Sequence, residues 1–95
     1  MTDKDNNQKI IPPIDFSSLV LPFFTQALIE LGQENDPKDK KKKKNFDLAK
    51  RLIDLLDLLK ERTKGNLKPE EEKFLNSCLH QLKIAYMEKA KIIKL

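Results

Sequence analysis

Hydrophobic residues recur at three- and four-residue spacing in three separate stretches of the chain, and this spacing predicts three amphipathic helices. The first stretch covers residues 16–31, the second runs from about Phe46 to Lys64, and the third begins at Pro69 with no glycine or proline before Leu95. The third helix is therefore expected to be the longest. The pattern predicts an all-α fold, a small antiparallel bundle of three amphipathic helices.

Polar residues and a glycine frame the first predicted helix. Asp15 or Ser17 can accept backbone N–H bonds at its start, and Gly32 can take the left-handed conformation that ends it. Pro22 lies inside the pattern. If the helix begins at Asp15, the proline lies about two turns inside and should kink it, whereas a start at residue 18 brings it near the tolerant first turn. We expect the kinked helix.

A tight corner is predicted between the second and third helices. Asn45 can cap the start of the second helix, and Gly65 suits the left-handed residue after its end. Leu67 lies where such an ending often makes an apolar contact back onto the last turn. Pro69 suits the first position of the third helix, and residues 70–72 are glutamates, which the helix dipole favours at that end.

The rest of the sequence predicts one domain in a reducing compartment. Residues 1–14 are polar and are expected to be disordered, residues 15–95 form one helical domain, and residues 33–45 form a lysine-rich loop. With one cysteine, Cys78, the chain has no intrachain disulfide, and its first residues lack the features of a secretory signal. The most apolar window, residues 16–29, is too short to span a membrane. We expect a cytoplasmic protein.

The positive charge of the chain is concentrated in one loop. Removing its five adjacent lysines from the formal net charge of +4 leaves −1, so the folded surface should be nearly neutral. The run could contact phosphates or anionic lipid headgroups, but it holds no aromatic residue and no arginine for reading bases. A solvated loop is the main prediction. Weak, non-specific binding of nucleic acid or an anionic surface is the alternative function, with these candidate contacts: Lys40, Lys41, Lys42, Lys43 and Lys44.

No combination of side chains predicts catalysis. Cys78 and His80 are two residues apart, so on a helix they point to different faces and cannot easily share a metal or act as nucleophile and base. Asp54, Asp57 and Glu61 form an acidic stripe, but lysine and arginine side chains lie nearby on the same helix. The two glycines of the chain lie at helix ends, which excludes a glycine-rich phosphate loop. We predict that the chain is not an enzyme and uses no cofactor or metal.

A family resemblance is carried by short motifs spread over residues 16–86. They are Phe16-Ser17, Ala27-Leu28, Leu31-Gly32, Asp36-Pro37, Leu48-Ala49-Lys50, Ile53-Asp54-Leu55-Leu56 and, above all, the corner Thr63-Lys64-Gly65-Asn66-Leu67 followed by Pro69-Glu70-Glu71-Glu72. In these residues the chain resembles the small bacterial proteins of the domain of unknown function 1844 family. The resemblance implies a bacterial, cytoplasmic, helical protein and carries no assigned activity. The chain departs from the family pattern at Pro22 and in the lysine run.

The apolar residues exceed what three short helices readily bury. A chain of 95 residues is near the size at which a single core only just suffices, which favours oligomerisation. We therefore expect a non-catalytic structural or regulatory module that binds another copy of itself, as a homodimer, or a helical partner. The candidate interface residues are Phe23, Phe24, Ile29, Met87, Ile92 and Ile93.

Overall fold

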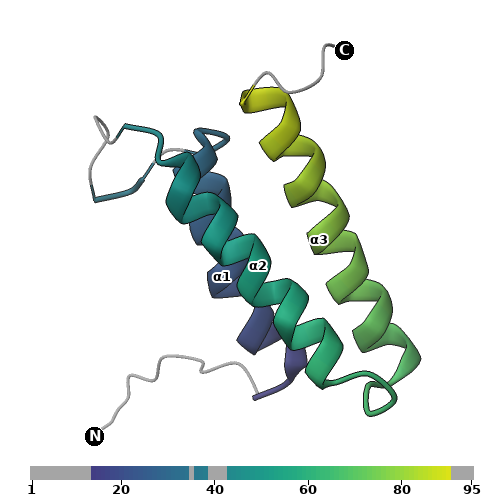
Figure 1. The fold of residues 1–95 in the computed structure, drawn as a ribbon. Helices are drawn as coiled ribbons and strands as arrows, with labels where there is room; N and C mark the ends of the chain where they lie inside the picture. The colour runs from purple at the N-terminus through teal and green to yellow at the C-terminus, as the bar shows by residue number, and fades with distance from the viewer. Residues whose placement is uncertain (1–13, 35, 39–42, 91–95) are drawn as a thin grey trace, which may run out of the picture.

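The described part of the chain folds into three helices that pack against one another (Figure 1). The structure is a computed structural model and describes residues 14–34, 36–38 and 43–90, which contain no β-strand. The helices are α1 (Phe16–Leu31), α2 (Phe46–Arg62) and α3 (Pro69–Lys89), and α3 is the longest with 21 residues. Consecutive helices run in opposite directions (Figure 1). The predicted all-α antiparallel bundle is confirmed.

Hydrogen bonds at its two ends explain the limits of α1. Asp15 is the cap, because its carboxylate accepts the Ser18 backbone N–H at 2.9 Å. Ser17 donates its hydroxyl to the same oxygen at 2.7 Å, and this bond, together with those from Ser18, lowers the pKa of the Asp15 carboxyl. At the other end Gly32 has φ of +82°, and the Gln33 N–H donates to the Leu28 carbonyl at 2.9 Å. This is the glycine-terminated ending predicted from the sequence.

The proline of α1 does not divide the helix. α1 begins at Phe16 and continues through Pro22 to Leu31, so the earlier of the two possible starts is correct and the proline lies inside the helix. Because proline has no backbone N–H, this turn has one donor fewer than a regular helix. Pro22 is exposed, so its ring occupies none of the core.

α2 begins where expected and ends slightly early. The Asn45 side chain accepts the Leu48 N–H at 3.0 Å and so caps the helix. The helix ends at Arg62 rather than near Lys64. The Leu59 carbonyl accepts two hydrogen bonds from Thr63, one from its backbone N–H at 3.0 Å and one from its hydroxyl at 2.7 Å, and both hold the last turn.

The corner between α2 and α3 has the predicted geometry. Gly65 has φ of +84° and lies in a turn closed by the Asn66 N–H, which donates to the Thr63 carbonyl at 2.8 Å. Leu67 is partly buried and packs against the core. Pro69 is the first residue of α3. The corner therefore returns the chain sharply, and α3 runs back along α2.

The core is formed by all three helices. An aromatic contact between α2 and α3 adds to it, because the rings of Phe46 and Tyr86 meet edge to face with centroids 6.2 Å apart. Tyr86 in the last turns of α3 therefore has a partner on α2. The buried apolar residues are Val20, Ala27, Leu31, Ala49, Leu52, Ile53, Leu56, Leu75, Cys78, Leu79, Leu82 and Ala85.

One buried charged residue was not foreseen from the sequence. Glu30 near the end of α1 is 1 % exposed, and the Gln26 amide donates to its carboxylate at 2.6 Å. Its backbone carbonyl accepts the Asn45 N–H at 2.8 Å. A buried polar group is tolerated when it is hydrogen-bonded, and the bond from Asn45 joins the end of α1 to the start of α2.

Candidate protein-interaction site

Large apolar side chains remain exposed on α1 and α2. On α1, Leu19 is 49 % exposed, Leu21 is 44 % and Phe23 is 37 %. On α2, Leu55 is 45 % exposed and Leu58 is 48 %. Single exposed leucines are common on protein surfaces, but a cluster contributed by two helices is not.

Four of these five side chains lie along one groove between α1 and α2. The groove has a volume of about 280 Å³ and is open to solvent; Leu21 is not part of its lining. We call it the α1/α2 groove, and its lining residues are Leu19, Phe23, Leu55, Leu56, Leu58, Leu59 and Arg62. Six of these seven residues are apolar, and the arginine lies at the end of α2.

The helical repeat explains why this surface is left open. Leu56 faces the core and is 1 % exposed, whereas its neighbour Leu55 is rotated by about 100° around the helix and reaches the surface. Leu58 is likewise exposed, whereas the next residue, Leu59, is partly buried. On α1, Leu19 borders the buried Val20 in the same way. The apolar arc of each helix is thus wider than the other two helices cover.

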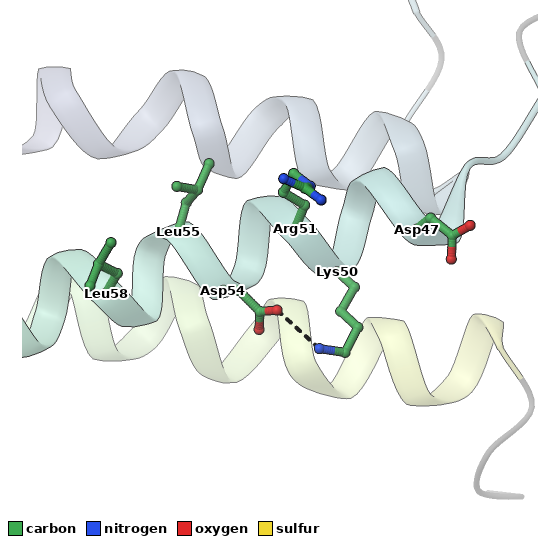
Figure 2. A pocket seen from close by; sticks show the side chains of 6 residues that line it. All are labelled: Asp47, Lys50, Arg51, Asp54, Leu55 and Leu58. Carbon is green, nitrogen blue, oxygen red and sulfur yellow. Dashed lines mark hydrogen bonds and ion pairs between the residues drawn. The ribbon is translucent and has the colours of Figure 1, made fainter.

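A second hollow continues this surface along the outer side of α2. Leu55 and Leu58 belong to both hollows, and the second is also lined by Asp47, Lys50, Arg51 and Asp54. Figure 2 shows Arg51, Leu55 and Leu58 on the side of α2 that faces α1. On the opposite side Lys50 and Asp54 form an ion pair of 3.0 Å, and this hydrogen bond raises the pKa of the Lys50 ammonium (Figure 2).

The structure separates the interface residues that were predicted from the sequence. Phe23 lines the α1/α2 groove. Phe24 is partly buried and packs against the core, and Ile29 is also partly buried. Met87 is partly buried and lines a different groove, between α2 and α3. The prediction for Ile92 and Ile93 lies outside the described residues.

Sequence reasoning missed three residues of the groove. Leu19, Leu55 and Leu58 follow the apolar period of their helices closely enough to be counted with the core, yet the structure leaves each about half exposed. The available signal was the width of the apolar arc on α2, because leucines at the adjacent positions 55–56 and 58–59 extend it beyond the usual apolar stripe of a surface helix.

The lysine run is described only in part. Lys40, Lys41 and Lys42 lie outside the described residues, and Lys43 and Lys44 are exposed. The aliphatic stem of Lys44 crosses the end of α1, since a Cβ added to Gly32 would lie 2.7 Å from its Cε. An exposed stem of this kind covers backbone while its ammonium group stays in water.

Cys78 and His80, the side chains considered for catalysis, lie in different environments. Cys78 is 4 % exposed within the core, and burial raises the pKa of its thiol, whereas His80 is exposed. Asp57 of the acidic stripe accepts a hydrogen bond from the Lys83 ammonium of α3 at 3.0 Å. Across the described part of the chain, no group of three or more histidine, cysteine, aspartate or glutamate residues could hold a metal ion.

None of the described helices has the length and apolar character required to span a bilayer.

These features define a small three-helix protein whose most distinctive surface is an open apolar groove between its first two helices. The model of a family described as a domain of unknown function, DUF1844, matches residues 13–88, and the chain belongs to this family. The matched region runs from just before α1 into the last turn of α3, so the family domain includes all three helices. No curated protein and no solved structure matches the chain.

Proposed function

We propose that this chain is a non-catalytic structural or regulatory interaction module that self-associates through the α1/α2 groove. The observation that supports the proposal is the convergence of four large apolar side chains from two helices, each 37 % to 49 % exposed, along one groove. Monomeric proteins seldom leave such clusters open to water, because covering them is favourable.

The free energy gained by burying these side chains is similar in size to the cost of association. Complete burial of a leucine or phenylalanine side chain contributes about 1.5–3 kcal/mol, so covering the exposed part of one of these side chains contributes about 0.7–1.5 kcal/mol. Eight such side chains meet in a symmetric dimer, for a total of about 6–12 kcal/mol. Association itself costs about 4–15 kcal/mol. The two ranges overlap, so we expect the dimer population to depend on protein concentration.

The proposal includes no reaction, cofactor or metal. Recognition in this account comes from burial of apolar helix surface, and the titratable groups of α2 serve to keep its outer side soluble and to orient the partner. We also propose a location in the cytoplasm of a bacterial cell, where a reducing environment keeps the single cysteine, Cys78, as a thiol.

The experiment is a measurement of solution mass by light scattering over a series of concentrations from micromolar to millimolar. We expect the mass of the full chain to rise from monomer to dimer. Phe23→Asp places a charge in the groove and should hold the chain as a monomer. Thr25→Asp is the matched control, because Thr25 is an exposed residue of α1 outside the groove lining. A wild-type chain that remains monomeric throughout the series contradicts the proposal.

A further inference from the structure

The exposed residues of α2 form a stripe in which charge and apolar character are ordered along the helix. Asp47 lies in the first turn, Arg51 follows one turn later, Leu55 and Leu58 occupy the middle, and Arg62 is the last helical residue. Asp47 and Arg51 line one hollow with the two leucines (Figure 2), and Arg62 lines the α1/α2 groove, to which both leucines also belong. Spacings of three and four residues place them on one side of the helix, and we call them the α2 stripe.

The α2 stripe is complementary to itself when a second copy lies antiparallel on it. A two-fold axis that crosses the helix between Asp54 and Leu55 is equally distant in sequence from Asp47 and from Arg62. Each Asp47 then faces the partner's Arg62, and symmetry forms this ion pair twice. The two copies of Leu55 meet beside the axis, and each Leu58 rests on the aliphatic stem of the partner's Arg51.

The charges favour the alignment that pairs Asp47 with the partner's Arg62 over the alignment that places Leu55 opposite the partner's Leu58. If Leu55 lay opposite the partner's Leu58, then Arg51 would lie opposite the partner's Arg62, and this repulsion would occur twice. Like charges facing each other in an interface are strongly unfavourable, whereas the leucines lose little in the first register because they remain within about one turn of each other. Electrostatics therefore selects the alignment, and the leucines supply the burial.

We propose that the α1/α2 groove is covered by a second copy of this chain, with α2 antiparallel to α2 of the partner and Asp47 paired with the partner's Arg62. Leu19 and Phe23 of α1 lie beside the stripe and cover the flank of the partner's helix. This inference rests on the proposed self-association and specifies its geometry.

The test is a charge exchange, read as the dimer dissociation constant from sedimentation equilibrium of the full chain at low salt. Asp47→Arg alone and Arg62→Asp alone each turn two attractive contacts into two repulsive ones, and each should weaken the dimer about tenfold. The variant that carries both substitutions rebuilds the pairs with their signs reversed and should return to within about threefold of the wild type. Lys73→Glu makes the same change in charge as Arg62→Asp at an exposed position of α3, and it should leave the dimer unchanged.

A cross-linking measurement covers the case in which a charge variant folds poorly. In a Cys78→Ala background, Leu55→Cys lies beside the proposed axis and should give a disulfide-linked dimer under oxidation, whereas Leu21→Cys should not. A monomeric wild-type chain would overturn both this inference and the proposed function. A dimer that is insensitive to both single substitutions, or whose double variant is not restored, would overturn the antiparallel register alone and leave self-association standing.

Discussion

Leu19 and Leu21 of α1 form a matched pair that tests whether the groove is the contact surface. Comparing them separates the role of the groove from the general effect of removing a surface leucine. Leu19 is 49 % exposed and lines the α1/α2 groove. Leu21 is 44 % exposed, lies two residues later in the same helix, and does not line the groove. Substitution of either by serine makes the same change in chemistry at nearly the same exposure.

The expected size of the effect follows from the exposed fraction. When a partner covers the exposed half of Leu19, each copy gains about half of the free energy of burying a leucine, or about 0.7–1.5 kcal/mol. A symmetric dimer loses this contribution twice, so Leu19→Ser should cost about 1.5–3 kcal/mol of association free energy. At 1.4 kcal/mol for each factor of ten, the dissociation constant should rise by a factor of about 10 to 150. Leu21→Ser should leave it within about threefold of the wild type.

Sedimentation equilibrium of the three proteins measures these constants, and urea unfolding of dilute samples provides the control. Both variants should lose similar and small amounts of monomer stability, because both leucines are about equally buried in the monomer. Equal dissociation constants for Leu19→Ser and Leu21→Ser would refute the assignment of the groove as the contact surface, even if the chain dimerises.

Three further predictions concern the fold. Leu82 is 0 % exposed, so Leu82→Ala should lower the free energy of unfolding by about 2–5 kcal/mol in urea titrations, with no comparable change for an exposed leucine such as Leu21. Gly65 has φ of +84° and nothing within 4 Å of an added Cβ, so Gly65→Ala tests backbone strain alone. It should cost about 1–2 kcal/mol by thermal unfolding, and Gly65→Asn should cost less because asparagine tolerates the left-handed region. Burial raises the pKa of the Cys78 thiol, so the unfolded chain loses this proton first as pH rises; stability should fall above the ordinary thiol value of 9.0, and Cys78→Ala should remove that fall.

The ends of the helices could be predicted because they depend on local chemistry. Asp15 and Asn45 cap helices in the structure as their side-chain oxygens allow, and Gly32 and Gly65 both adopt positive φ. Pro69 begins α3 because the backbone N–H that proline lacks would have no partner at the first position of a helix. Each of these features is decided within a few residues, so the sequence contains the necessary information.

The division between core and groove could not be predicted because it depends on how the helices lie against one another. Leu55 and Leu56 are equally hydrophobic, and only the rotation of α2 relative to α1 and α3 decides that one is 45 % exposed and the other 1 %. The burial of Glu30 has the same origin, since a glutamate at the end of a helix is typically solvated. Phe24, which the sequence predicts as an interface residue, is partly buried and packs against the core.

Dimerisation through the α1/α2 groove can be measured directly by methyl NMR spectra of leucine-labelled protein recorded over a dilution series. The methyl signals of Leu19, Leu55 and Leu58 should shift together with concentration, because these side chains leave water in the dimer. The signals of Leu21 and of the buried Leu82 should shift far less. Spectra that do not change with dilution, or changes centred on Leu21 and away from the groove, would show that the groove is not a dimer interface.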